Sequence, residues 1–144
     1  MKKLLMTITS IALLLTLSLS LVACSSYGKI EKALEEIGYA KVESSQEAED
    51  LEEESEVPVT MHVFSNTAKL DMVIVMEFKS TDEMKEYYED SNTLQGLVKD
   101  IKEDGSAKEF YDSLVEKGYA NKNCLVININ PFVADAVKTA VKNA

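Results

Sequence analysis

The sequence predicts an α+β fold, with helices packed on a three- or four-stranded, mostly antiparallel sheet. Residues 57–64 and 70–78 alternate apolar and polar side chains or run apolar throughout, which is typical of strands, and a short turn joins them. Residues 30–37, 81–104, 106–118 and 131–141 carry apolar residues at helical spacing. Since the connections are short, we expect antiparallel neighbours and a single domain over residues 30–144.

The first residues have the layout of a secretory signal peptide. Lys2 and Lys3 give a positive start, and residues 4–22 carry no charge. A retained transmembrane helix is the alternative, because about 20 apolar residues span a bilayer. The Ser and Thr content of the run, and the small residues that end it before Cys24, favour a signal peptide over residues 1–23 that is removed.

Leu21, Val22, Ala23 and Cys24 resemble the lipobox of bacterial lipoproteins, and this resemblance covers residues 1–24. It implies cleavage after Ala23 and a diacylglyceryl group on the Cys24 sulfur, and it leaves N-acylation of Cys24 open. Each buried methylene contributes about 0.8 kcal/mol, so two acyl chains retain a protein stably. The expected location is the extracytoplasmic face of the cell membrane, with the lipid on Cys24 as the attachment. The remainder of the chain resembles small envelope lipoproteins.

The chain is acidic, with 25 Asp and Glu against 15 basic residues and a formal charge of −10. Such a surface is repelled by anionic lipid and by nucleic acid, so we expect neither to bind the body directly. With Cys24 lipidated, Cys124 remains alone, which excludes an internal disulfide. The apolar neighbours of Cys124 predict a buried structural thiol.

The N-terminal part of the mature chain is expected to hold a tether, a helix and a short strand. The tether covers residues 24–29, the helix ends at Gly38, and the strand lies within 39–42. Residues 43–56 hold eight acids and no base, which predicts an exposed helix or a mobile linker. Calcium binding is the alternative, but the segment lacks the alternating Asp and Asn with a central Gly that calcium loops carry.

The two central strands are expected to form a hairpin around a turn at residues 65–68. Pro58 fits only the start or an edge of the first strand. The second strand has apolar residues on both sides, with Val73 and Val75 opposite the row that runs from Leu70 to Phe78. We therefore expect it to be central and covered on both faces.

The C-terminal half is expected to hold helices on either side of one more strand. Capping-box spacing at Ser80 and at Ser106 predicts a helix start after each serine. The first of these helices is broken or bent near residues 91–93. A strand follows at 125–129, and Asn130 and Pro131 begin a last helix whose apolar residues include Phe132.

Two corners of the chain are alike, at residues 38–40 and 118–120, where both read Gly-Tyr-Ala. Each follows an amphipathic helix and precedes an expected strand. A duplicated helix–strand unit is one interpretation, and a common way of capping helices is the other. Both interpretations predict that the two corners are built alike.

The residues that could carry chemistry are few. His62, the one histidine, lies on the less apolar side of the first strand, and a solvent-exposed position is favoured over a catalytic one. His62 and Cys124 are too few ligands for zinc, and the scattered glycines form no phosphate-binding loop. We expect no catalytic, metal or cofactor site.

The sequence thus predicts a non-catalytic, lipid-anchored protein that binds an envelope protein, a wall component or a small ligand. The alternative is a small envelope hydrolase that uses paired carboxylates. An enzyme requires a cleft with two acids of different pKa, whereas a binding protein requires an exposed apolar patch.

Overall fold

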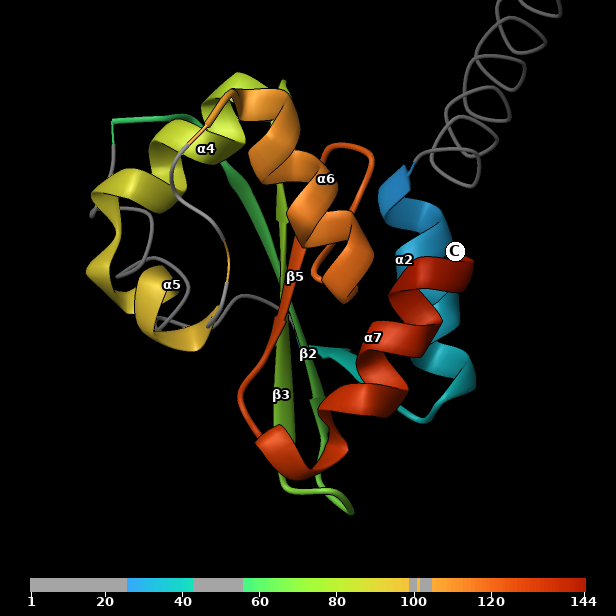
Figure 1. Ribbon diagram of the computed structural model, residues 1–144. Helices are drawn as coiled ribbons and strands as arrows, with labels where there is room; N and C mark the ends of the chain where they lie inside the picture. The colour runs from blue at the N-terminus through green and yellow to red at the C-terminus, as the bar shows by residue number, and fades with distance from the viewer. Residues whose placement is uncertain (1–25, 43–55, 99–100, 102–104) are drawn as a thin grey trace, which may run out of the picture.

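The computed structural model describes residues 26–42, 56–98, 101 and 105–144. In these residues one antiparallel sheet forms, in the strand order β1-β2-β3-β5-β4 (Figure 1). The strands are β1 (Ala40–Val42), β2 (Thr60–Asn66), β3 (Asp71–Glu77), β4 (Ala120–Asn121) and β5 (Cys124–Asn128). The predicted α+β class is confirmed, but the sheet has five strands rather than three or four. The difference is β4, whose two residues pair with β5 as a hairpin and are too few to show a period.

Helices cover both faces of this sheet. They are α2 (Ser26–Glu36), α4 (Thr81–Asp90), α5 (Asn92–Leu97), α6 (Ala107–Lys117), the 3-10 helix η1 (Pro131–Val133) and α7 (Ala134–Asn143). Figure 1 shows α4 and α5 on one side and α2 and α7 on the other. Ile74 and Met76 of β3 pack into the core with α4, α5 and α6. Val73 and Val75 pack into the core with α2 and α7, which confirms a central strand covered on both faces.

The central hairpin has the expected register and one shifted boundary. β2 pairs with β3 from Thr60 opposite Glu77 to Asn66 opposite Asp71. β2 begins at Thr60 rather than at Val57, so Pro58 precedes the strand, as a residue without an N–H donor must.

The predicted helix starts are confirmed by their caps. The Ser80 hydroxyl accepts a hydrogen bond from the backbone N–H of Glu83, and Ser106 with Glu109 forms a complete capping box. Ser91 ends α4 and its side chain caps α5, so the expected interruption near 91–93 is a real break between two helices. α5 ends at Leu97, and most of the residues up to 104 lie outside the described part of the chain.

The start of the domain differs from the expectation. α2 begins at Ser26, and Tyr27 and Ile30 are buried in the core. Residues 26–29 therefore belong to the domain rather than to a tether. Cys24 and residues 43–55 of the acidic segment lie outside the described residues.

The two Gly-Tyr corners are built alike, as predicted. Gly38 has φ of 91° and Gly118 has φ of 80°, the left-handed conformation that ends many helices. The Tyr39 N–H donates to Leu34 at 3.0 Å, and the Tyr119 N–H donates to its counterpart on α6 at 2.8 Å. Each corner leads into an edge strand, β1 or β4. The two helix–strand units thus flank β3 at opposite edges and on opposite faces of the sheet.

Candidate functional site

The one histidine lies under α2 rather than in solvent. The His62 side chain is 17% exposed, and its ring stacks on that of Tyr27 with the centroids 3.7 Å apart. The prediction of an exposed histidine was wrong, because α2 starts earlier than expected and covers this part of β2. Burial, together with the nearby charge of Lys41, holds the pKa of His62 below its ordinary value, so the ring is neutral at pH 7.

Charged side chains surround the neutral His62 ring, whose Nε2 is buried and has no hydrogen-bond partner among the described residues. His62 Nε2 lies 3.6 Å from Glu77 Oε2, and Lys41 Nζ lies 3.4 Å from Glu31 Oε1. The Tyr27 hydroxyl donates to the same Glu31 oxygen at 3.1 Å. These contacts join α2 to β1, β2 and β3, which is a structural role.

No activated nucleophile accompanies this histidine in the described residues. Cys124 is fully buried, as predicted, and burial raises the pKa of its thiol to about 12. A thiol with such a pKa carries almost no thiolate at neutral pH and is unreactive. In the same residues no three His, Cys, Asp or Glu side chains are grouped to hold a metal ion.

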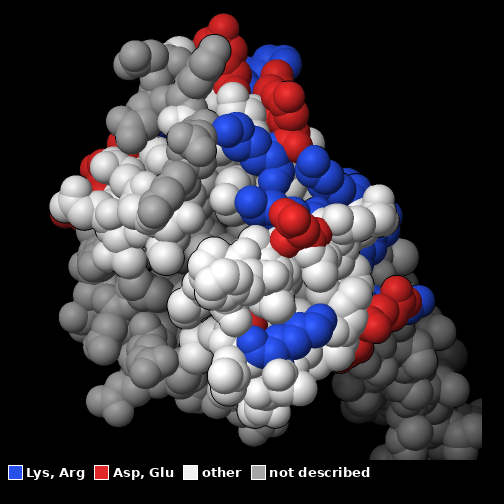
Figure 2. Space-filling view, turned by 60° about the horizontal axis from the view of Figure 1, so that its bottom comes forward, with Lys and Arg blue, Asp and Glu red and all other residues white. Residues whose placement is uncertain are grey.

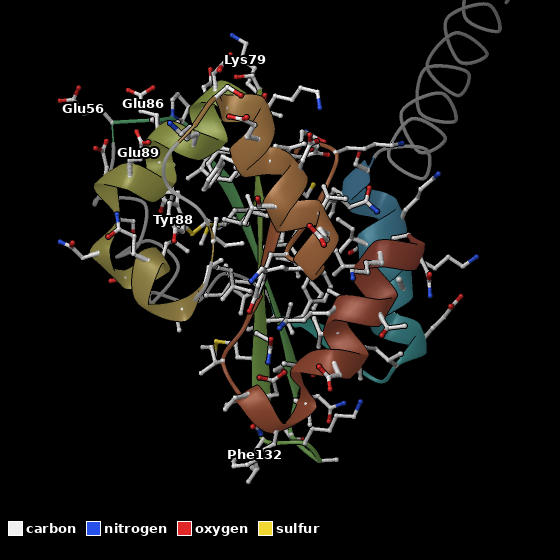
Figure 3. All side chains as sticks on the ribbon, in the orientation of Figure 1. Glu56, Lys79, Glu86, Tyr88, Glu89 and Phe132 are labelled. Carbon is white, nitrogen blue, oxygen red and sulfur yellow. The ribbon has the colours of Figure 1, made fainter. Side chains whose placement is uncertain are left out.

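A second arrangement fits binding rather than catalysis. Three large apolar side chains are exposed at one end of the molecule: Leu70 by 85%, Ile129 by 50% and Phe132 by 95%. They come from the β2–β3 turn, the residue after β5 and η1, and we call them the apolar pole. Figure 3 shows Phe132 at the end where β2 and β3 turn, and Figure 2 shows a largely uncharged surface there, with Lys side chains lying across it. Exposed apolar groups gathered in this way mark interaction sites.

A buried carboxylate holds the apolar pole in place. Asp71, the first residue of β3, is only 6% exposed. One of its oxygens accepts from the Tyr39 hydroxyl at 2.6 Å, and the other accepts from the Asn130 N–H at 2.7 Å. Hydrogen bonds to a charged acceptor are about twice as strong as neutral ones, so Asp71 ties the β5–η1 connection firmly to the sheet.

The Asn130 side chain bridges the two outermost residues of the pole. Its amide nitrogen donates to the carbonyls of Lys69 and Leu70 at 2.9 and 3.4 Å, and its amide oxygen accepts from the Phe132 N–H at 3.0 Å. Asn130 is therefore the predicted N-cap, and it also fixes the β2–β3 turn against η1.

Leu70 occupies a conformation that its side chain disfavours. Its φ is 50°, in the left-handed region, where a residue with a Cβ costs about 1–2 kcal/mol. Glycine or asparagine fits such a turn better, and an exposed leucine adds nothing to the core. Strain of this kind is retained at functional sites more often than elsewhere.

A groove continues from the pole along the edge of the sheet. It encloses about 350 Å³ between α5, the end of β5 and α7. Its apolar lining includes Leu97, Ile129 and Pro131, and its polar lining includes Asn128, Asp135 and Lys138. The ammonium group of Lys138 lies 4.5 Å from the centre of the Tyr119 ring, which forms another wall.

The sequence patterns did not identify the residues of the pole. Leu70, Ile129 and Phe132 were assigned to the apolar sides of two strands and a helix, and all three are exposed. Leu70 precedes β3, Ile129 follows β5 and Phe132 lies in a 3-10 helix, and at such positions the period does not fix the direction of the side chain. The available signal was their position beside Lys69, Asn130 and Pro131, which are turn and cap residues.

No family model, curated protein or solved structure matches this chain. Across the residues that the structure describes, none of the helices has the length and apolar character needed to cross a membrane.

Proposed function

We propose that this protein is a lipid-anchored, extracytoplasmic binding protein whose apolar pole docks on a partner polypeptide. The observation that carries the proposal is the combination of exposure and rigidity at the pole. Leu70 and Phe132 project into solvent, yet both backbones are tied to Asn130 and through it to buried Asp71. Rigid, projecting apolar side chains are typical anchors of protein interfaces.

A macromolecular partner explains Phe132 better than a small ligand does. With 95% of its surface exposed, Phe132 is almost uncovered by the described part of the chain. A pocket that buries this side chain is a feature that a macromolecular partner offers and a small ligand does not.

The proposed anchor places the pole away from the membrane. Cys24 precedes Ser26 by two residues, so the chain can separate their Cα atoms by at most about 7 Å. Tyr27 stacks on His62 beside Glu77, the last residue of β3, whereas the pole surrounds Asp71, the first. β3 has seven residues, which separates its two ends by about 20 Å.

The alternative function, a carboxylate hydrolase, has no comparable support. Asp71 is the one acidic residue that is buried in the described part of the chain, and both of its oxygens hold structural donors. On half-buried Glu83, one oxygen is buried without a hydrogen-bond partner in the same residues. We therefore propose a non-catalytic role.

The anchor is tested by labelling. A bacterium with lipoprotein processing, fed labelled fatty acid, should incorporate the label into the full-length chain and not into Cys24→Ala, which should retain its leader. Label on the Cys24→Ala protein would show that the attachment is elsewhere.

The binding role is tested by native electrophoresis of complexes solubilised from the envelope. The wild-type chain should migrate as a complex, and Phe132→Ser should migrate as the free protein. Val115→Ser is the matched control, because Val115 is also partly exposed but lies on α6. Equal migration of the Phe132→Ser and wild-type chains would contradict the proposal.

A further inference from the structure

The outer edge of β5 is covered along only part of its length. β4 contributes two residues, Ala120 and Asn121, which pair with the first half of β5. Immediately before β4, the Tyr119 carbonyl accepts one more hydrogen bond from β5, donated by the Val126 N–H at 2.6 Å. The Tyr119 N–H turns back to α6, so the described chain adds no further backbone pair to this edge.

The register shows which backbone groups face that edge. The Asn123 carbonyl accepts a hydrogen bond from the Phe78 N–H, and the Ile129 N–H donates to the Met72 carbonyl. The backbone N–H and carbonyl groups of the odd-numbered residues from 123 to 129 therefore point toward β3. Pairing groups alternate along an antiparallel strand, so the N–H and the carbonyl of Asn128 face the opposite side. Asn128 lines the groove described above, whereas Val126 is buried and does not line it.

The groove has the form that an added strand requires. It lies at the sheet edge between the two helical layers, with Leu97 of α5 on one side and Lys138 of α7 on the other. Successive side chains of a strand point to opposite faces, so alternate residues of an occupant would meet these two walls. At Gly96 a side chain would find no atom within 4 Å, so the α5 wall leaves room for an apolar side chain.

The charge of the lining also suits a peptide. The ionisable side chains that line the groove are one acid, Asp135, and one base, Lys138, apart from the Tyr119 phenol. The chain as a whole carries −10. The groove is thus close to neutral on a strongly acidic protein and does not repel an occupant that carries acids.

We propose that the groove binds an extended peptide segment of the partner, which pairs with the open edge of β5 as an added strand. Its backbone bonds to the N–H and the carbonyl of Asn128. Its apolar residues face Leu97, and the polar residues between them face Asp135 and Lys138. Strand addition of this kind takes affinity from the backbone and specificity from alternate side chains. The inference rests on the proposed function and names the chemical class of its partner.

The test uses a random peptide library panned on the full-length chain in lipid nanodiscs. We expect enriched peptides with alternating apolar and polar residues, which lose binding when alternate backbone amides are N-methylated. Asn128→Pro and Asn128→Ala form a matched pair, because both lose the side chain and only the proline loses the N–H. Asn128→Pro should weaken binding about tenfold relative to Asn128→Ala.

A second variant tests the groove without altering β5, so that misfolding of Asn128→Pro does not decide the outcome. Gly96 lines the groove and a Cβ there would stand in open space, so Gly96→Phe leaves β5 unchanged and should also abolish binding. Failure to enrich any peptide family, or equal binding of N-methylated peptides, would overturn the strand-addition inference. If the N-methylated peptides bind as well as the unmodified ones and their binding still requires Phe132, the proposed function stands without strand addition. If binding needs neither Phe132 nor the groove, both proposals fail.

Discussion

Replacing Leu70 by asparagine should stabilise the folded protein while weakening its binding. Leu70 has φ of 50° and is 85% exposed, so the folded state contains a strained residue that buries almost nothing. The left-handed conformation costs an ordinary residue about 1–2 kcal/mol, and asparagine tolerates it well. We expect Leu70→Asn to raise the free energy of unfolding by about 0.5–1 kcal/mol.

Urea unfolding measures this gain, and Lys122 supplies the control. With a slope of about 1–2 kcal/mol per molar urea, the midpoint should rise by about 0.5 M. Lys122, in the β4–β5 turn, has φ of 52°, and Lys122→Asn should bring a similar gain. Only Leu70→Asn should weaken the complex, because a leucine buried in an interface contributes about 1.5–3 kcal/mol. The reasoning fails if Leu70→Asn binds as tightly as wild type, or if it destabilises the fold while Lys122→Asn stabilises it.

Further predictions concern stability and follow from single contacts. Asp71→Ala leaves the buried Tyr39 hydroxyl and the Asn130 N–H without their acceptor. It should lower the free energy of unfolding in urea by about 3 kcal/mol or more, whereas Tyr39→Phe should lower it by about 1–2 kcal/mol. Equal losses would contradict the bridging role of Asp71. The folded state holds the pKa of His62 below the ordinary 6.5, so protonation favours the unfolded chain. The free energy of unfolding should therefore fall as the pH drops below 6.5, and His62→Gln should remove that part of the slope; an unchanged slope would refute this. Gly38→Ala and Gly118→Ala should each lower the free energy of unfolding by about 1 kcal/mol, because both glycines have a left-handed φ. Gly118→Ala should lose about 1–3 kcal/mol more, because its Cβ would lie 3.0 Å from a carbonyl oxygen of α7. Similar melting temperatures for the two variants would contradict this.

The centre of the fold was predictable because its signals are local. A strand covered on both faces must be apolar on both, and residues 70–78 showed that for β3. Cap chemistry is equally local, so Ser80, Ser106 and Asn130 marked three helix starts correctly.

The missed features depend on contacts between distant segments. β4 exists because the Gly118 corner delivers two residues to β5, and two residues carry no period. His62 is covered because Tyr27, far away in the chain, stacks on it. The pole is exposed because Asn130 holds a turn and a 3-10 helix beyond the ends of the sheet, and no alternation encodes that direction.

Site-specific cross-linking in the cell envelope tests the central claim most directly. A photoreactive phenylalanine analogue is placed at position 132 of the full-length chain, and at position 115 as the control. Position 132 should give a discrete polypeptide adduct that disappears with Leu70→Asn, and position 115 should give none. Contradiction would come from adducts of equal yield at both positions, or from lipid adducts at position 132, which would show that the pole faces the membrane.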